Sequence, residues 1–370
     1  MEKVKLRITT ITPVTIGSGK ELSPYADYIA EKDKIYFIDT KKSIDKIMAK
    51  GDKFLEDYIS GIANGMDNNR SLFDLKNFLF GNRIVQSIEE VSSIKCSFVG
   101  DSKFKHPIKG MIQSPLGEPY IPGSTIKGAL KTILMYNWLK NNKQGNKIIE
   151  DVLTKKDNRG RPLNFDSLEK KFETFVDREN RLIRKNTIQQ VTDSTFLKPE
   201  SKVVVDCYRK MPIRLECIPK GETAEFELVL DKFKWEELAM QINEYVKDSI
   251  NREFEIIKEQ DDLIAYYSNL VDIKEEVTKA KSNVAYLRLG FGKGYYLNSL
   301  GIAIYDYVMQ DGKEELRDKY EKFINTNFAR KNKYGIIQEI ELEEFPKTRL
   351  YVSNTQEPLG WVKIEKVNYL

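Results

Sequence analysis

Leu289-Gly290-Phe291-Gly292-Lys293-Gly294-Tyr295-Tyr296 places three glycines at alternate positions around one lysine. Glycine reaches backbone angles that are closed to other residues, and it lets another chain approach the main chain closely. Exposed N–H groups beside a cation suit phosphate oxygens. The aromatic residues of this loop favour a nucleic-acid backbone over a free nucleotide as the ligand. A tight turn before a buried segment is the structural alternative.

The spacing of these glycines excludes the two common nucleotide-binding motifs. A P-loop needs a second glycine five residues after the first, followed by Lys and by Ser or Thr. The dinucleotide fingerprint needs its third glycine one position later than Gly294, at the start of a helix that follows a strand.

A second motif lies upstream, at residues 119–131. Pro122 and Gly123 end the preceding segment, and Ser124 or Thr125 is a good N-cap. Apolar residues then recur at helical spacing. The pattern therefore predicts a helix that begins at about Ser124.

Three residues of this helix work against its own stability. Lys127 in the first turn is disfavoured by the helix dipole by about 0.3–1 kcal/mol. Gly128 costs about 1 kcal/mol relative to Ala in a helix interior. Lys131 lies one turn after Lys127, so the two like charges repel. Local rules that are broken together indicate a functional site, here for a phosphate backbone. A solvated basic face on an ordinary core helix is the alternative.

Four further segments complete a set of motifs. They are residues 12–19 (Thr-Pro-Val-Thr-Ile-Gly-Ser-Gly), Tyr28-Ile29 leading into residues 35–39, Val191-Thr192-Asp193-Ser194, and residues 359–364 (Leu-Gly-Trp-Val-Lys-Ile). In this order, on a chain of this length, the set resembles the RAMP proteins of CRISPR interference complexes. Among these it is most similar to the fifth subunit of the Csm-type, type III-A complexes. The resemblance covers nearly the whole chain in outline.

The order of expected elements predicts an α+β fold. Two units of mixed strands and helices, each with a Gly-rich turn, fit two ferredoxin-like (RRM-like) RAMP domains. A chain of 370 residues also exceeds one ordinary core. We expect a first domain over residues 1–210, with a helical insertion at 41–90 and a basic loop insertion at 155–187. The second domain would cover 211–370 and contain the Gly-rich loop 290–294.

The opening segment is expected to be a strand, because Val4, Leu6 and Ile8 alternate with basic residues. No aromatic RNP signature is present, so base stacking on an open sheet is not expected. The other expected elements are strands at 34–38, 94–99, 189–196, 202–207, 349–352 and 361–367, a hairpin of 215–218 with 225–230, a long helix at 235–259, and a helix or strand at 300–307.

The most basic irregular region is residues 155–185. Its cations include Arg178, Arg181, Arg184 and Lys185, and acidic residues lie among them. A solvated charged loop is the simpler interpretation. The functional interpretation is an arm that contacts RNA and is ordered by its ligand.

The composition restricts the class of protein. The net charge of +4 is mild, so basicity must be local if RNA is the partner. Cys96, Cys207 and Cys217 lack metal-ligand spacing, and we expect three small buried hydrophobes in a reducing cytoplasm. The sequence shows no signal peptide and no apolar run that would span a membrane. We expect a cytoplasmic protein without metal or cofactor.

Three residues are candidates for catalysis. His106 is the only histidine, and one imidazole could act as the general base of a metal-independent ribonuclease that processes repeat RNA. Related CRISPR processing endonucleases work in this way. Asp27 lies in a loop comparable to the one that holds the cleaving aspartate of sister backbone subunits, although its sequence context differs. Asp193 is either an acid or an Asx-turn residue. We expect none of them to be catalytic.

The resemblance implies a non-catalytic RNA-binding subunit that caps the backbone filament near the 3′ end of the guide RNA (crRNA). It implies a part in crRNA maturation, by defining or protecting the trimmed end or by recruiting a host trimming nuclease. The expected partners are crRNA, the repeated backbone RAMP subunit and the small helical subunit, with no membrane and no small-molecule substrate. The expected RNA-binding residues are Gly123, Ser124, Lys127, Gly128, Lys131, Arg178, Arg181, Arg184, Lys185, Arg288, Gly290, Gly292, Lys293 and Gly294.

Overall fold

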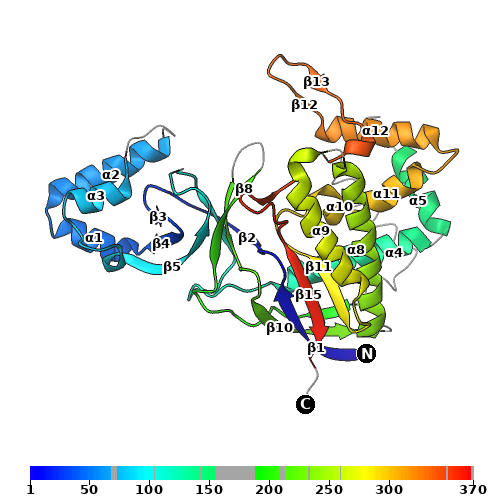
Figure 1. Cartoon of the computed structure of the whole chain (residues 1–370), viewed down its shortest axis with the longest axis horizontal. Coiled ribbons are helices and arrows are strands. Elements are labelled where there is room, and N and C mark those ends of the chain that lie inside the picture. Colours follow the sequence, from blue (N-terminus) through cyan, green and yellow to red (C-terminus); the bar gives the residue numbers. More distant parts are fainter. Residues whose placement is uncertain are drawn as a thin grey trace.

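The computed structural model describes residues 1–67, 73–103, 105–141, 143–154, 188–208, 213–231, 234–258, 260–346 and 349–367. The expected basic insertion at 155–187 lies outside the described residues. Two large sheets form the centre of the structure (Figure 1).

The first sheet has the strand order β11-β15-β1-β10-β7, with every neighbouring pair antiparallel. Its strands are β1 (Glu2–Thr10), β7 (Ile188–Val191), β10 (Thr223–Leu230), β11 (Val284–Arg288) and β15 (Trp361–Lys366). Two helices, α4 (Gly123–Asn141) and α8 (Trp235–Ile257), share its core. The chain order β1-α4-β7-β10-α8-β15 is that of a ferredoxin-like unit, to which β11 adds an edge strand. The expected α+β class and ferredoxin-like architecture are confirmed.

The alternation of β1 fixes which of its faces is buried. Val4, Leu6 and Ile8 are buried in one cluster with α4 and α8, as the sequence pattern predicts. The basic side chains on the opposite face pair with carboxylates of β10. These ion pairs are Lys3–Glu227, Lys5–Glu225 and Arg7–Glu225. The cations on this face of β1 are therefore paired with carboxylates, so the face is not a purely basic surface.

The second sheet has eight strands, in the order β2-β6-β9-β8-β5-β4-β3, with β14 paired to β8. They are β2 (Gly17–Leu22), β3 (Tyr28–Glu31), β4 (Lys34–Ile38), β5 (Ser92–Val99), β6 (Ile108–Met111), β8 (Val203–Tyr208), β9 (Ile213–Cys217) and β14 (Tyr351–Val352). Cys96, Cys207 and Cys217 are buried free thiols in this sheet. Their burial confirms the expectation of three small buried hydrophobes, and it raises the pKa of Cys96 to about 12.

The sheets do not divide the chain at residue 210. The expected boundary falls between β8 and β9, which are antiparallel neighbours in one sheet. The expected hairpin of 215–218 with 225–230 is also wrong. β9 pairs with β8 and β6, whereas β10 pairs with β1 and β7 in the other sheet. The turn between β9 and β10 therefore carries the chain from one sheet to the other.

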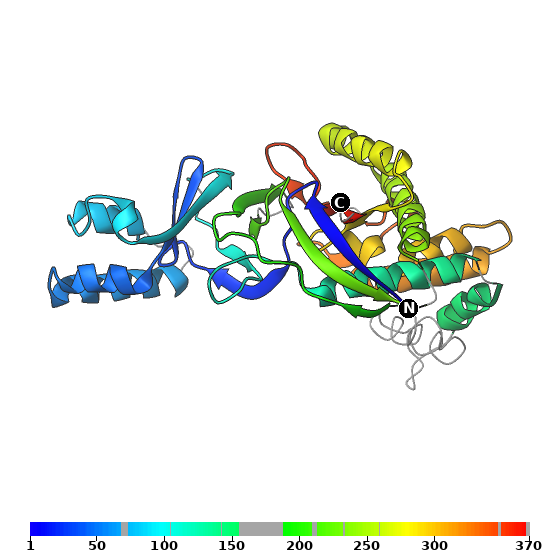
Figure 2. The same cartoon turned by 90° about the horizontal axis from the view of Figure 1, so that it is seen from below.

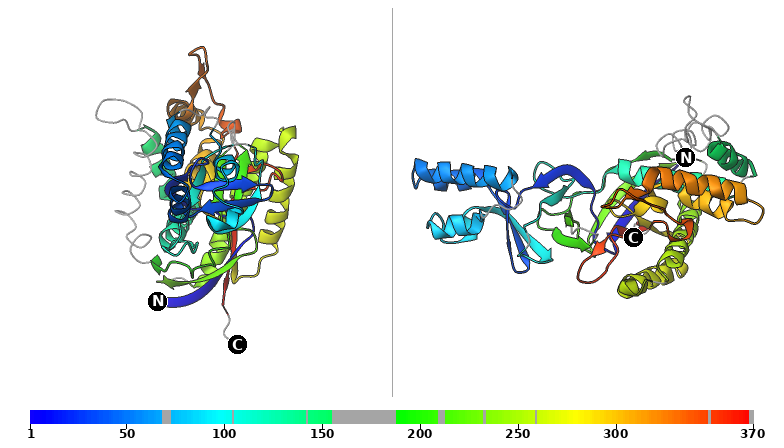
Figure 3. Two further views of the ribbon diagram at one scale, coloured as in Figure 1. Left: turned by 90° about the vertical axis from the view of Figure 1, so that its left-hand side faces the viewer. Right: turned by 90° about the horizontal axis from the view of Figure 1, so that it is seen from above.

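The helical insertion expected at 41–90 is confirmed as helical. It contains α1 (Thr40–Met48), α2 (Asp52–Asp67), α3 (Leu75–Gly81) and the short η1 (Ile88–Glu90). These elements form a separate apolar cluster that includes Ile29, Tyr36 and Ile38 of β3 and β4. They lie at one end of the long axis, away from α4 and α8 (Figures 1 and 2, and Figure 3, right).

The other helices in the described ranges lie around the first sheet, on the opposite side of the molecule from the insertion (Figure 1). They are α5 (Lys143–Thr154), α9 (Ile264–Thr278), α10 (Gly294–Asn298), α11 (Gly301–Val308) and α12 (Glu314–Phe328), with η2 (Asp261–Leu263) and η3 (Leu342–Glu344). A small hairpin of β12 (Arg330–Lys331) and β13 (Ile337–Gln338) follows α12. The segment expected as helix or strand at 300–307 is the helix α11.

Candidate nucleic-acid interface

The first sheet brings the sequence motifs to one end. Each neighbouring pair is antiparallel, so β11, β1 and β7 run in the same direction. Their carboxyl ends lead into the Gly-rich loop 290–294, residues 11–19 and residues 192–194 respectively. Four strand spacings separate β11 from β7, which is about 19 Å. The motifs therefore line one end of a sheet rather than a single pocket.

The Gly-rich loop is fastened by two other motifs. The N–H of Leu289 donates to the carbonyl of Gly360 at 2.7 Å, and the N–H of Gly360 donates to that of Pro13 at 2.8 Å. The N–H of Phe291 donates to the carbonyl of Thr15 at 2.9 Å. Segments that are far apart in the sequence thus form one hydrogen-bonded junction, which fixes the path of the loop.

The three glycines of the loop differ in how closely the rest of the protein surrounds them. All have a positive φ, of 71° at Gly290, 95° at Gly292 and 74° at Gly294. A Cβ at residue 290 would lie less than 3.0 Å from the carbonyl oxygen of Thr15, so packing alone requires this glycine. A Cβ at residue 292 would be in ordinary contact with Leu359, at 3.4 Å. Residue 294 is exposed and a Cβ there would meet no atom within 4 Å, so packing does not require this glycine.

A small cavity of about 30 Å³ lies under the loop. Lys293, Glu253, Arg349 and Ser249 are among its lining residues. Lys293 is half-buried, and its pKa is lowered by burial and then by the neighbouring charge of Arg288. Burial thus destabilises the ammonium of Lys293, and an anion beside it would compensate. The arrangement suits a phosphate group.

Arg288 itself is enclosed by protein. Its side chain is 1% exposed, Nε donates to the carbonyl of Leu359 at 2.8 Å, and Nη1 lies 3.4 Å from Oε2 of Glu253. Glu253 also pairs with Nε of Arg349 at 3.0 Å and accepts from the hydroxyl of Tyr266 at 2.5 Å. The structure therefore places Arg288 as a support of the loop, and not on the surface where the sequence expectation had it contact RNA.

The second motif forms the start of α4, which begins at Gly123. Asp193, and not Ser124 or Thr125 as expected, accepts the N–H of Gly123 through its Oδ1 at 2.8 Å. A Cβ at residue 123 would lie less than 3.0 Å from the carbonyl oxygens of Val191 and Thr192. The sequence could not show this long-range cap, although the short side chain of Asp193 at a strand end is compatible with one.

Lys127 of α4 lies beside β7. Lys127 is exposed and donates from Nζ to the carbonyl of Gln189 at 3.1 Å. Because α4 begins at Gly123, Lys127 lies in the second turn, where the dipole penalty is smaller than expected from the sequence. Gly128 is exposed, and a Cβ there would meet no atom within 4 Å. Lys131 follows one turn later and is half-buried. Arg178, Arg181, Arg184 and Lys185 lie outside the described residues.

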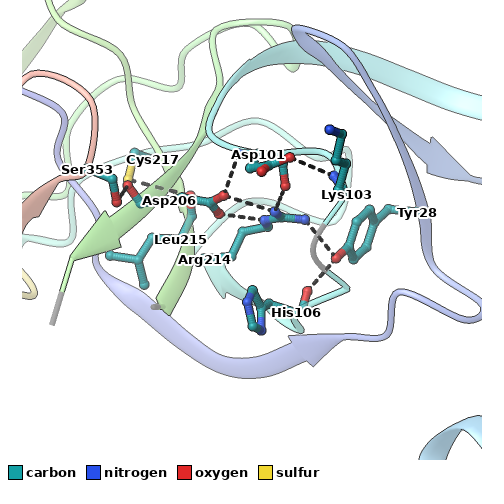
Figure 4. Close-up of polar contacts among 9 residues, drawn as sticks. All are labelled: Tyr28, Asp101, Lys103, His106, Asp206, Arg214, Leu215, Cys217 and Ser353. Atoms are coloured by element: carbon teal, nitrogen blue, oxygen red, sulfur yellow. Dashed lines mark hydrogen bonds and ion pairs between the residues drawn. The ribbon is translucent and has the colours of Figure 1, made fainter. Parts of the chain in front are cut away.

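His106 belongs to a different polar cluster, in the second sheet (Figure 4). The fully buried Arg214 pairs with Asp206 through Nε at 2.6 Å and Nη2 at 3.0 Å, and donates from Nη1 to the hydroxyl of Tyr28 at 3.2 Å. Tyr28 donates in turn to the main-chain carbonyl of His106. Asp101 completes the cluster, because its N–H donates to Asp206 and its carbonyl accepts from Arg214. These contacts attach the loop before β6 to the sheet.

The other candidate acid has a structural role. Asp27 accepts the N–H of Ser23 through Oδ2 at 2.6 Å, and its own N–H donates back to the carbonyl of Ser23 at 2.9 Å. It therefore closes the turn before β3. Within the described ranges, no group of three or more His, Cys, Asp or Glu side chains could hold a metal ion. Among the helices that are described, none has the length and apolar character needed to cross a membrane.

The comparison with protein families is decisive for the fold and family. A sequence model of the RAMP superfamily matches residues 7–296. The chain belongs to the RAMP superfamily. The RAMP segment thus begins within β1 and includes α4, β11 and the Gly-rich loop.

Individual relatives narrow the resemblance. The Methanocaldococcus jannaschii protein named CRISPR system Cms protein Csm5 is 27% identical over 402 aligned positions, covering 98% of this chain and 89% of that protein. The Streptococcus thermophilus protein of the same name is 33% identical over 35% of this chain and 37% of its own length. The expected similarity to the fifth Csm subunit is confirmed.

Two solved structures share the fold of this RAMP protein. One chain of the cryo-EM structure of a Csm–crRNA–target RNA ternary complex of a type III-A system has a TM-score of 0.64 at 20% identity, over 98% of this chain and 100% of that chain. The crystal structure of Csm5 from T. onnurineus has a TM-score of 0.60 at 18% identity, over 96% and 99%.

Proposed function

We propose that this RAMP protein is a non-catalytic RNA-binding subunit of a type III-A CRISPR complex. Membership of the RAMP superfamily and similarity to proteins named Csm5 along nearly the whole chain support this assignment. A structural neighbour comes from a complex that contains crRNA and target RNA. The partners proposed for this chain are therefore crRNA and other Csm subunits.

One observation carries the RNA-binding part of the proposal. The same end of the first sheet presents the Gly-rich loop with Lys293 and, towards the opposite edge, the start of α4 with Lys127. Both elements offer a cation and an exposed glycine, Gly294 and Gly128 respectively. Such groups contact phosphates and carry no sequence information. The RNA is therefore held by its backbone, independently of its sequence.

We also propose a finer role for this RAMP protein. We place the subunit at the end of the backbone filament near the 3′ end of crRNA, next to the repeated backbone RAMP subunit and the small helical subunit. There it contributes to crRNA maturation, by defining or protecting the trimmed end or by recruiting a trimming nuclease. The helical insertion gives one end of the chain a surface unlike the ferredoxin-like unit, which suits a terminal subunit (Figure 1).

The first test measures binding and cleavage of end-labelled crRNA and repeat RNA in the same samples. For single strands, the slope of log K against log salt is about 0.7 per phosphate contact, so Lys127→Ala/Lys131→Ala should reduce it by about 1.4. The control is Lys50→Ala/Lys53→Ala, which removes the same charge from the helical insertion and should leave the slope unchanged. The expected result is salt-sensitive binding without turnover of the RNA.

His106→Ala distinguishes the enzymatic alternative. If the wild-type protein cuts repeat RNA at a defined site without metal, and His106→Ala abolishes the cut, the chain is an endoribonuclease and the proposal is wrong. The geometry of His106, held through its main-chain carbonyl by Tyr28, leads us to expect no such activity.

The role of the helical insertion is tested on its surface, because deletion would expose the side chains of β3 and β4 that it covers. Met48 and Ile59 are exposed apolar residues of this insertion. Met48→Glu/Ile59→Glu should reduce co-purification with the backbone subunit and preserve RNA affinity. Met240→Glu, at an exposed position of α8, is the control. Loss of RNA affinity with intact subunit contacts would contradict this assignment.

A further inference from the structure

The hairpin of β12 and β13 projects from the end of α12 beyond the rest of the fold (Figure 1). Every side chain from residue 330 to 339 is exposed except the half-buried Asn332. An isolated two-stranded hairpin is marginally stable in water and needs other contacts to persist. This hairpin therefore adds little to the core, and we attribute its sequence to a contact with another molecule.

The hairpin is nevertheless built with a fixed tip and a fixed base. At the tip, Oδ1 of Asn332 accepts the N–H groups of Tyr334 at 2.9 Å and Ile336 at 3.1 Å. Gly335 completes the turn with a φ of 80°. At the base, the side-chain amide of Asn325 on α12 both donates to and accepts from the main chain of Ile340, at 3.0 and 2.8 Å. The tip is thus presented in one orientation.

The residues at this tip are apolar and basic. Tyr334 is 74% exposed, Ile336 63% and Ile337 58%. The ammonium of Lys333 lies 4.9 Å from the centre of the Tyr334 ring. With Arg330 and Lys331, residues 330–338 carry three cations and no acid. Over the described residues, none of these cations makes an ion pair with a carboxylate.

The base of the hairpin packs against α10, which directly follows the Gly-rich loop. The ring of Phe328, the last residue of α12, lies 5.3 Å from that of Tyr295 in α10 and 5.1 Å from that of Phe345. Tyr295 directly follows Gly294. Six residues separate Phe328 from Tyr334, which span at most about 20 Å of extended chain. The tip is therefore close enough to the Gly-rich loop for one RNA strand to reach both.

We propose that the tip of this hairpin stacks on an unpaired base of single-stranded RNA. The ring of Tyr334 takes the face of the base, and Arg330, Lys331 and Lys333 neutralise the flanking phosphates. Base–aromatic stacking tolerates any sequence because every base has a π face. The inference rests on the proposed function, since the base belongs to the same RNA strand that the Gly-rich loop and α4 hold.

Charge complementarity favours RNA over a protein as the occupant. A protein interface would draw on the exposed Ile336 and Ile337, but its core is usually depleted of charge. Here three cations lie within four residues of the exposed ring. An aromatic residue with adjacent cations is the combination found on single-strand binding surfaces.

The test uses the full chain and a series of single-stranded RNAs in which one adenine at a time is replaced by 2-aminopurine. Stacking quenches the fluorescence of this base, and anisotropy of an end label gives the affinity. For the wild-type protein we expect quenching at one or two positions. Tyr334→Ala should abolish it and weaken binding about tenfold, whereas Tyr334→Phe should preserve both. Tyr267→Ala, at an exposed position of α9, is the control and should change neither.

Each outcome decides between the two proposals. If the wild-type chain binds no RNA, the proposed function fails and this inference fails with it. If RNA is bound with the same affinity and quenching after Tyr334→Ala, RNA binding stands and the stacking hairpin is overturned. If Ile336→Ser/Ile337→Ser prevents co-purification with other subunits while Tyr334→Ala leaves quenching unchanged, the hairpin is a protein contact and the inference is wrong.

Discussion

The Gly-rich loop and the start of α4 combine the same residue types for different structural reasons. In the loop, Gly290 is required by packing, because a side chain would strike the main chain of Thr15. In α4, Gly128 is exposed and has no neighbour that a methyl group would meet. A glycine that the fold requires says nothing about a ligand. A glycine that costs helix stability without any packing reason indicates one.

The same distinction applies inside the loop. Gly290 and Gly292 face other parts of the chain, whereas Gly294 faces open space. The cations separate in a similar way, because Arg288 is enclosed by protein and Lys293 borders a cavity. We therefore predict that phosphate binding by this loop depends on Lys293 and Gly294, and that their neighbours hold the geometry.

The largest expected effect tests the packing glycine. Gly290→Ala should destabilise the protein by more than about 3 kcal/mol, because a positive φ and a clash with the Thr15 carbonyl add together. Gly294→Ala should cost only about 1–2 kcal/mol, from the positive φ alone. Urea unfolding of both variants measures the difference. Equal losses would show that the open space at Gly294 is filled by the protein, and would remove the contrast between the two glycines.

Arg288 gives the next largest effect. Arg288→Met should lower the free energy of unfolding by about 2–3 kcal/mol, because removing one partner of a buried ion pair leaves a charge uncompensated. Arg349 still pairs with Glu253 and limits the loss. Salt dependence of RNA binding should stay the same in the folded variant. A weaker salt dependence of RNA binding with unchanged stability would instead indicate that Arg288 contacts RNA.

Much of the local structure could be predicted from the sequence, because it depends on neighbouring residues. The alternation of β1, the helical stripe of α4 and the amphipathic pattern of α8 all have a local period, and each element exists as expected. The choice of partner strand has no such local signal. β9 and β10 look like a hairpin because only a short turn separates them, but their buried faces belong to different sheets.

Prediction of the candidate site is limited in the same way, because contacts between distant residues leave no local signal in the sequence. The glycine and lysine spacing predicted the two elements that we propose to bind phosphate, since those residue types are informative in any context. Burial of Arg288 depends on Glu253 and Leu359, which lie far away in the sequence. The cap that Asp193 provides to α4 likewise joins residues about one-fifth of the chain apart. Neither contact leaves a periodic trace.

Substitution of Lys293 should change the stability of the free protein and its affinity for RNA in opposite directions. Burial and Arg288 lower its pKa in the folded protein, so the unfolded chain holds this proton to a higher pH. Between the two pKa values the unfolded state binds more protons, and stability therefore rises with pH. Lys293→Met should remove this contribution and stabilise the free protein at pH 7, while weakening RNA binding about tenfold through the loss of one charged contact.

Unfolding curves at neutral and alkaline pH, compared between wild type and Lys293→Met, measure the first effect, and anisotropy measures the second. Lys293→Arg is the control, because it keeps the charge. A loss of both stability and affinity in Lys293→Met would instead make Lys293 a structural residue of the loop.

The smallest expected effect, that of Gly128→Ala, gives the most specific test of whether RNA contacts the exposed glycine of α4. Gly128→Ala should stabilise the protein by about 1 kcal/mol, because an exposed helix interior prefers alanine and the added methyl group meets nothing. If RNA approaches the main chain there, the same methyl group should weaken binding. Stability and affinity would then change in opposite directions, which neither a folding defect nor a solvated helix face can produce. A variant that is more stable and binds RNA as tightly as wild type would show that Gly128 contacts no phosphate, and would leave Lys127 as a surface charge on an ordinary core helix.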